Sequence, residues 1–126
     1  MAELLLTIPD AWWWSTNERV HHHVRATKTK AVRQYAAIQA QNAGIPRFMQ
    51  AHVCVFVGYP TRRRADPTNI AGTVSKAAID GLTDAGVWED DDSEHVIAVE
   101  FRRDTALAPK GHHTLRLVLT DQCLPF

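Results

Sequence analysis

Alternating hydrophobic and polar positions predict four β-strands along the chain. The clearest is residues 52–58, where the β-branched side chains of Val53, Val55 and Val57 fall on one face. Residues 114–120 repeat the alternation with three leucines, and residues 95–103 alternate apolar with polar side chains. Residues 4–8 form a shorter apolar run that ends at Pro9, so we expect a short first strand there.

Two other segments have the spacing of amphipathic helices. Gly44 and Pro46 stop the first, residues 29–43, whose predicted apolar side is Val32, Tyr35, Ala36, Ile38 and Ala43. Gly86 suits the left-handed position after the second, residues 73–85, whose predicted buried stripe is Val74, Ala78, Ile79 and Leu82. We expect residues 10–27 to be irregular, residues 59–70 to form a basic loop and residues 87–94 to form an acidic turn.

The order β-α-β-α-β-β predicts a two-layer α/β (α+β) domain with a mixed β-sheet and two main helices. The chain has 126 residues, the size of one ordinary domain, and such a domain buries roughly two-thirds of its unfolded surface. We therefore expect residues 1–126 to form a single domain.

Cysteine usage and hydropathy bear on the compartment. Cys54 and Cys123 have no metal-ligand spacing, and this is typical of a reduced, cytoplasmic protein. No apolar run approaches the ~20 residues of a membrane span. The N-terminus carries Glu3 where a signal peptide has basic residues. The sequence therefore predicts a cytoplasmic protein with no membrane partner.

The net charge of zero conceals two oppositely charged halves. Residues 1–64 hold nine Lys and Arg against three acids, a charge of +6, whereas residues 65–126 hold five against eleven, a charge of −6. A metal-dependent nucleic-acid enzyme can use both signs, because basic residues bind phosphates while carboxylates bind the metal. Dimerisation through complementary charge explains the same asymmetry equally well, and so does chance.

Four consecutive carboxylates, Glu89 to Asp92, follow the second predicted helix. A solvated turn is the ordinary reading of such a run. The alternative is a seat for Mg²⁺ or Ca²⁺, which prefer carboxylate oxygens. Asp66 precedes the same helix, and Lys76 and Asp80 share one of its faces. Asp66, Asp90, Asp91 and Lys76 therefore make up a candidate metal-assisted phosphate site.

Three other clusters have two readings each. The histidines His21–His23 are a transition-metal site or, as we favour, an exposed basic loop near DNA. The tryptophans at positions 12–14 stack on unpaired bases or, as we favour, belong to the core or a dimer interface. The run Arg62-Arg63-Arg64 is a solvated turn or, next to Asp66, a phosphate contact, which we favour.

The central motif resembles the RusA family of Holliday junction resolvases over the segment RRRADPTNIAGTVSKAAIDGLTDAGVWEDDDSEHV. That family has an arginine-rich turn, Asp-x-Asp-Asn, a helix with Lys and Asp four apart, an Ala-Gly cap and an Asp-Asp pair. The matching positions are Arg64, Asp66, Asn69, Lys76, Asp80, Leu82, Ala85, Gly86, Asp90 and Asp91. Asn17, Arg19 and His21 are similar to the family's Asn-x-Arg-x-His segment, so the resemblance spans roughly residues 4–120.

The resemblance implies a homodimeric endodeoxyribonuclease, common in phages, that uses Mg²⁺, with Mn²⁺ as a possible substitute. Such enzymes bind four-way DNA junctions and make paired symmetric nicks. The implied catalytic residues are Asp66, Asp91 and Lys76, and the implied metal ligands are Asp66, Asp90 and Asp91. The expected DNA contacts are Arg19, Arg62, Arg63, Arg64, Asn69 and Lys76.

The sequence departs from the family pattern in two places. Thr68 stands where the family has its second Asp, and the stretch from Asn69 to Lys76 is four residues longer. A hydroxyl is a weaker ligand than a carboxylate, so either the metal count falls or Asp90 or Asp92 supplies the missing charge. Two rival functions follow: a weakened relative that binds branched DNA without cutting it, and a divalent-cation-binding interaction module with no DNA role.

Overall fold

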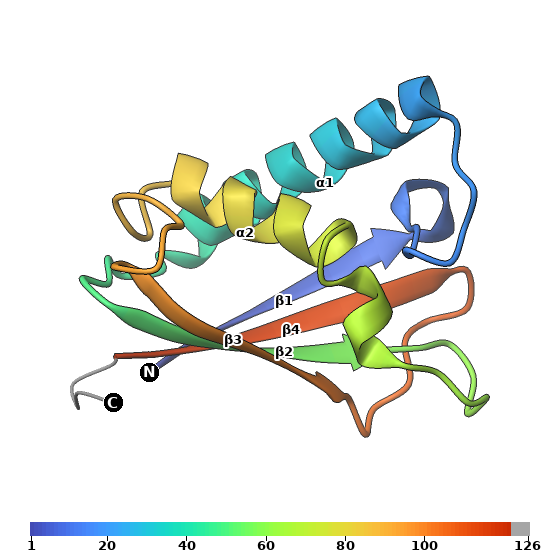
Figure 1. Ribbon diagram of the computed structural model, residues 1–126. Helices are drawn as coiled ribbons and strands as arrows, with labels where there is room; N and C mark the ends of the chain where they lie inside the picture. The colour runs from blue at the N-terminus through green and yellow to red at the C-terminus, as the bar shows by residue number, and fades with distance from the viewer. Residues whose placement is uncertain (122–126) are drawn as a thin grey trace.

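The computed structural model describes residues 1–121, and Cys123 falls outside them. The described chain forms one four-stranded mixed sheet (Figure 1). Its strands are β1 (Ala2–Pro9), β2 (Ala51–Gly58), β3 (Val96–Arg103) and β4 (His112–Asp121), in the order β1-β4-β2-β3. β4 is antiparallel to both β1 and β2, whereas β2 and β3 are parallel. A parallel pair needs a crossover, and α2 (Val74–Asp84) supplies it.

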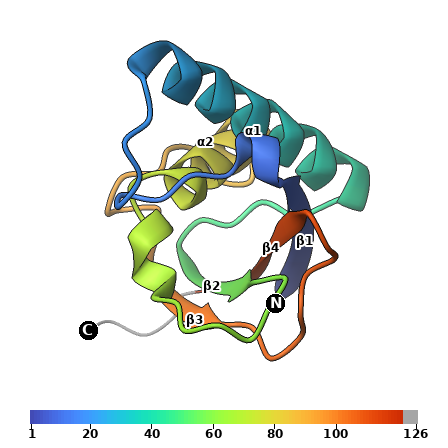
Figure 2. The same cartoon turned by 90° about the vertical axis from the view of Figure 1, so that its right-hand side faces the viewer.

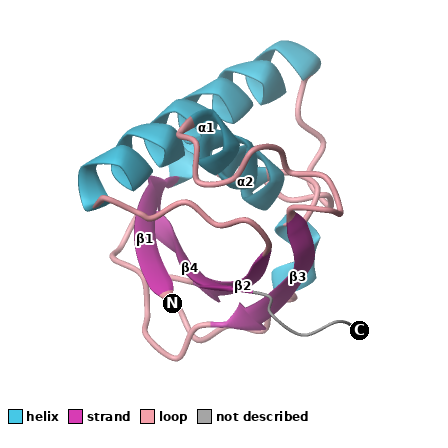
Figure 3. Cartoon of the chain, turned by 90° about the vertical axis from the view of Figure 1, so that its left-hand side faces the viewer, coloured by secondary structure: helices cyan, strands magenta, loops and turns pink. Residues whose placement is uncertain are grey.

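Both helices cover the same face of the sheet (Figures 1 and 3). α1 (His22–Ala43) and α2 pack against each other above the strands. Two short 3₁₀ helices, η1 (Asp10–Trp12) and η2 (Pro67–Ile70), lie in the loops. The predicted two-layer α+β architecture with a mixed sheet is confirmed.

The core lies between the helices and the sheet. Alternate residues of β1, β2 and β4 point into it and are almost fully buried, namely Leu4, Leu6, Ile8, Val53, Val55, Val57, Leu115, Leu117 and Leu119. The predicted stripe of α2 is buried, and Gly86 has a φ of 80°, as expected for the residue after the helix. Trp13 and Trp14 are also core residues, in line with the favoured reading of the tryptophan run.

The first helix differs from the prediction. α1 begins at His22, not at residue 29, so His22 and His23 are helical instead of part of a loop. Residues 21–27 are all exposed, and an exposed helical segment carries no apolar stripe for periodicity to detect. The buried residues of α1 are Val32, Ala36 and Ala40. Ile38 is 54% exposed and Ala43 is exposed, so the predicted apolar side was wrong at both positions.

Neither α1 nor α2 covers the opposite face of the sheet, where Arg116 makes several polar contacts. The Arg116 guanidinium donates to Asp104 Oδ2 at 3.0 Å and to Glu3 Oε1 at 3.0 Å, and it lies over the Phe56 ring. Within residues 1–121, none of the helices combines the length and hydrophobicity needed to cross a membrane.

Candidate functional site

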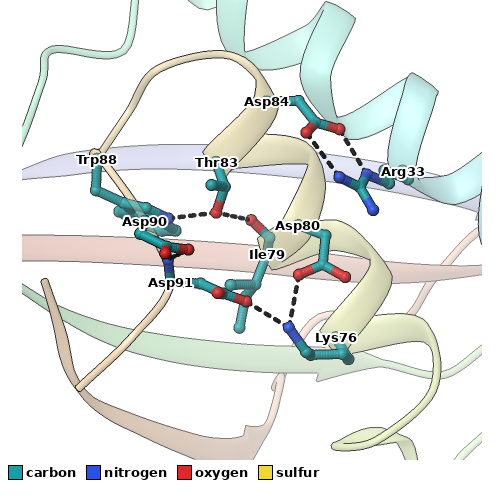
Figure 4. Close-up of polar contacts among 9 residues, drawn as sticks. All are labelled: Arg33, Lys76, Ile79, Asp80, Thr83, Asp84, Trp88, Asp90 and Asp91. Carbon is teal, nitrogen blue, oxygen red and sulfur yellow. Dashed lines mark hydrogen bonds and ion pairs between the residues drawn. The ribbon is translucent and has the colours of Figure 1, made fainter.

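The acidic turn starts from a fixed point in the core. Trp88 is only 1% exposed, and its indole Nε1 donates to Thr83 Oγ1 at 2.7 Å (Figure 4). Thr83 Oγ1 in turn donates to the carbonyl of Ile79 at 3.1 Å. This chain of hydrogen bonds ties the turn to the last two turns of α2, and it thereby determines where the following carboxylates can lie.

Three of the four carboxylates contact groups of the turn itself. Glu89 Oε2 lies 3.4 Å from His95 Nε2, and Asp92 and Asp90 accept hydrogen bonds there. Asp92 Oδ1 accepts hydrogen bonds from the backbone of Glu94 and His95 and from the His95 ring. The hydrogen bond with His95 lowers the pKa of Asp92, and the same bond raises the pKa of His95. Asp90 Oδ1 accepts from the backbone N–H of Asp91 at 2.8 Å. The predicted acidic turn is therefore confirmed, and Asp90 and Asp92 contribute hydrogen bonds to it.

Asp91 has a different role, because it meets Lys76 across the helix. Lys76 Nζ donates to Asp80 Oδ1 at 2.6 Å and also to Asp91 Oδ2 (Figure 4). Hydrogen bonding to the Lys76 ammonium lowers the pKa of Asp91 below its ordinary value. Partial desolvation lowers the pKa of Lys76, but the two carboxylates outweigh this effect and raise it overall. Lys76, Asp80 and Asp91 form the lysine–carboxylate cluster.

A second ion pair joins α1 to α2 beside this cluster. Arg33 donates from Nε to Asp84 Oδ2 at 2.6 Å and from Nη2 to Asp84 Oδ1 at 2.8 Å (Figure 4). Hydrogen bonding to Asp84 raises the pKa of Arg33, with smaller contributions from Asp80 and Asp91. Arg33 therefore interacts electrostatically with the lysine–carboxylate cluster. No sequence pattern signals its pairing with Asp84, which is 51 positions away.

Asp66 lies at the other end of the α2 segment, at the start of η2. Its Oδ1 accepts from the Thr68 hydroxyl at 2.7 Å and from the Thr68 backbone N–H at 3.1 Å. These bonds lower the pKa of Asp66 below its ordinary value. Thr68, the departure from the family pattern, is therefore a hydrogen-bond donor to the predicted catalytic carboxylate.

η2 lies between α2 and β3, and the N-terminal loop runs beside it (Figure 2). The backbone N–H of Thr16 donates to the Asn69 carbonyl at 2.9 Å, and Thr73 Oγ1 donates to the Trp14 carbonyl at 3.0 Å. The loop that carries Arg19 is therefore attached to the loop that carries Asp66.

Two neighbouring pockets form where these loops meet. The smaller, of about 230 Å³, is lined by Trp13, Ser15, Glu18, Tyr59, Arg64, Ala65, Asp66, Asn69 and Ile70. The larger, of about 750 Å³, shares Ser15 and Glu18 with it and is also lined by Arg19, His21, Arg25 and Thr73. Two predicted DNA contacts, Arg64 and Asn69, thus share a pocket with Asp66, and a third, Arg19, lines the neighbouring pocket.

The two aromatic residues that line the smaller pocket, Trp13 and Tyr59, both contact the ring of His113 in β4. No sequence pattern marks His113 as a site residue. The His113 ring stacks on Trp13 with centroids 4.2 Å apart, and Tyr59 meets its edge at 5.6 Å. His113 Nδ1 lies 3.1 Å from Asp10 Oδ1. Desolvation lowers the pKa of His113, so the neutral ring is favoured.

The arginine run is exposed, as a phosphate contact requires. Arg103 donates from Nη1 to the Arg63 carbonyl at 2.6 Å and from Nη2 to the Thr61 carbonyl at 2.9 Å. Its guanidinium also lies over the Tyr59 ring. Arg103 therefore fixes the backbone of the run while the side chains of Arg62, Arg63 and Arg64 face solvent.

The predicted metal ligands suit magnesium in chemistry, because carboxylate oxygens are its preferred protein ligands. Their arrangement in the folded protein, however, does not form a metal site. Within residues 1–121, no three His, Cys, Asp or Glu side chains are grouped in a way that could hold a metal ion. Asp91 is bonded to Lys76, Asp90 to the turn and Asp66 to Thr68. The assignment of Asp66, Asp90 and Asp91 as ligands stays a prediction.

No protein-family model matches the chain, and no curated protein sequence matches it either.

Proposed function

We propose that this protein is a metal-dependent endodeoxyribonuclease that resolves four-way junctions and other branched DNA by paired symmetric nicks. The observation that carries the proposal is the contact between Lys76 and Asp91, two motif residues that are 15 positions apart. Support also comes from the pocket that Asp66 and Arg64 line and from the neighbouring pocket, which Arg19 and Arg25 line. A carboxylate site next to basic pockets is suited to a phosphodiester.

The proposed roles follow from the chemistry of each group. Asp66 and Asp91 are the carboxylates for Mg²⁺ or Mn²⁺, and a bound ion of this kind polarises a phosphate and activates water. Lys76 places an ammonium beside Asp91, where it can balance charge on a phosphate oxygen. Arg19, Arg64 and Asn69 position the strand at the pockets, and Arg62 and Arg63 bind phosphates outside them. The free thiol of Cys54 suits a reducing compartment, in keeping with a cytoplasmic site of action.

The test measures cleavage of a labelled four-way junction in Mg²⁺ by three variants and by the wild-type protein. We expect Asp66→Asn and Asp91→Asn each to lose cleavage by at least roughly a hundredfold while keeping junction affinity within a few-fold, because affinity comes mainly from Lys and Arg on phosphates. Asp92→Asn is the matched control, since its carboxylate serves the turn. Full cleavage by either of the first two variants would remove these assignments.

One observation favours a second function, a relative that binds branched DNA without cutting it. Asp66 is bonded to Thr68 instead of facing a second acid, and residues 1–121 contain no ready metal cluster. This alternative predicts junction binding that is equally tight in Mg²⁺ and in EDTA, with intact strands in both. The proposed nuclease instead yields cut strands only in the presence of the metal.

A further inference from the structure

α1 carries charges of only one sign. Its 22 residues include Arg25, Lys28, Lys30 and Arg33 but no Asp or Glu. Two of these cations have a partner within the protein, since Lys28 donates to the Trp13 carbonyl and Arg33 binds Asp84. Within residues 1–121, neither Arg25 nor Lys30 forms an ion pair with a carboxylate. Among these four cations only Arg33 is therefore neutralised by a carboxylate of the described chain, and Lys28 is held by a neutral carbonyl.

The cations near the N-terminus of α1 are electrostatically unfavourable for the helix itself. The N-terminal end of a helix has a partial positive charge, which favours acids and disfavours cations. The first turn of α1 has no acid, and His22, His23 and Arg25 lie at its start. Departures from such local rules are expected at functional or strained positions, and an anion bound at this end of the helix would offset the repulsion.

The same part of the helix is free of the core. Residues 21–27 are exposed, and the buried residues of α1 begin only at Val32. Figures 1 and 3 show the N-terminal turns of α1 extending beyond α2 and away from the sheet. The N-terminal half of α1, residues 22–32, is about 16 Å long at 1.5 Å per residue. One DNA strand carries a phosphate about every 3.4 Å of axis, so this half can lie along several phosphates.

The exposed basic residues connect the two parts of the candidate site. Arg25 lines the large pocket together with Arg19. On its other side it lines a shallow groove along α1 with His22, Lys30 and Arg33. Arg33 then lies beside the lysine–carboxylate cluster, whose acids raise its pKa. A strand of phosphates laid along this surface passes from the Asp66 pockets towards Lys76 and Asp91.

We infer that the exposed N-terminal half of α1, with Arg25 and Lys30 as its main contacts, is a docking surface for the sugar–phosphate backbone of one double-stranded DNA arm. The inference rests on the proposed DNA partner, but not on cleavage. Duplex DNA fits because it presents one negative charge per ~1.7 Å of axis, and such a charge density matches a helix that carries cations without acids.

The test compares the wild-type protein with Arg25→Glu/Lys30→Glu by fluorescence anisotropy on a duplex and on a four-way junction across a salt series. Arg47→Glu/Lys110→Glu is the control, because both residues are exposed, lie on other loops and give the same change in net charge. We expect the α1 variant to lose roughly tenfold or more in affinity, and its salt slope to fall by about 2, one for each lost phosphate contact. The control should stay close to wild type.

Folding of the α1 variant is checked by its thermal unfolding midpoint, which should not fall, because acids near a helix N-terminus are favourable. Equal losses in both variants overturn the inference, since affinity then follows net charge alone. Unchanged binding by the α1 variant also overturns it while leaving the proposed nuclease intact. If the wild-type protein binds neither the duplex nor the four-way junction, both this inference and the proposed function are wrong. Tighter binding to duplex RNA than to duplex DNA overturns the choice of DNA as the partner.

Discussion

Lys76 is the residue on which the candidate site depends, because one ammonium bonds two carboxylates that lie four and 15 positions away. The first contact is a helical i, i+4 pair and follows directly from the sequence. The second needs the acidic turn to fold back along α2, and Trp88 and Thr83 make that possible. Removing Lys76 would leave Asp80 and Asp91 as neighbouring like charges.

We predict that Lys76→Met lowers the free energy of unfolding at pH 7 by on the order of 0.5–1 kcal/mol, as expected for partly exposed pairs that are screened by solvent. The pKa of Asp91 is lower in the folded protein, so its contribution is present above the unfolded pKa of about 3.9 and is lost as the pH falls through the folded value. Urea unfolding at pH 7 and pH 3 should show the difference between the two proteins shrinking at pH 3. An equal difference at both pH values contradicts the pairing.

Thr68 offers a second test at a single position. Thr68→Asp restores the family pattern, but it also removes the hydroxyl that donates to Asp66 and sets a carboxylate beside a carboxylate. We predict cleavage equal to or lower than that of wild type across a Mg²⁺ titration, because the new carboxylate repels that of Asp66 and the hydroxyl donor is lost. Higher activity, or half-maximal cleavage at lower Mg²⁺, would instead show that the site lacks a ligand at position 68.

At the scale of elements, the strands were predictable because burial on one face imposes a period of two. The start of α1 was not, since His22 to Lys28 lie outside the core and nothing in their pattern distinguishes an exposed helix from a loop. The exposure of Ile38 was missed for a related reason. α2 occupies the side of α1 that carries Ala36, and a close helix contact selects the small side chain over the large one.

That close contact leads to a prediction for α2. A Cβ added at Gly81 would lie 2.4 Å from the Arg33 carbonyl and 2.8 Å from Ala36 Cβ. We expect Gly81→Ala to destabilise the protein by about 1–3 kcal/mol, although alanine is the better helix former by about 1 kcal/mol. Thermal and urea unfolding measure the change. Gly72→Ala is the control, because a Cβ there meets nothing within 4 Å. Equal stability of the two variants would contradict the packing.

At the scale of the whole molecule, the sequence showed two charged halves, and the fold shows where they meet. Arg33 from the basic half pairs with Asp84 from the acidic half, and Arg103 supports the basic run. The contacts of His113 with Trp13 and Asp10 join residues about a hundred positions apart. Local patterns carry no information on such pairings, so the helical contact of Lys76 with Asp80 was predictable from the sequence, whereas these long-range contacts were not.

A junction has two equivalent strands to cut, and one domain with one acid cluster makes one nick. We therefore predict a homodimer in solution without DNA, since two-fold symmetry gives two copies of the site related as the two strands are. Lys76 and the run Arg62-Arg63-Arg64 should lie on the face that carries both sites. Light scattering that shows a stable monomer at micromolar concentration would count against the dimer, and so would a dimer whose two sites open on opposite faces.

The proposed junction-resolving activity is tested by mapping the cuts that the wild-type protein makes on a four-way junction labelled in turn on each of its strands. With Mg²⁺ we predict one nick in each of two strands of like polarity, at symmetric positions, giving ends that ligase can join, and no nicks in EDTA. Intact strands at protein concentrations that saturate the junction in Mg²⁺, or unpaired nicks scattered along all four strands, would contradict the account.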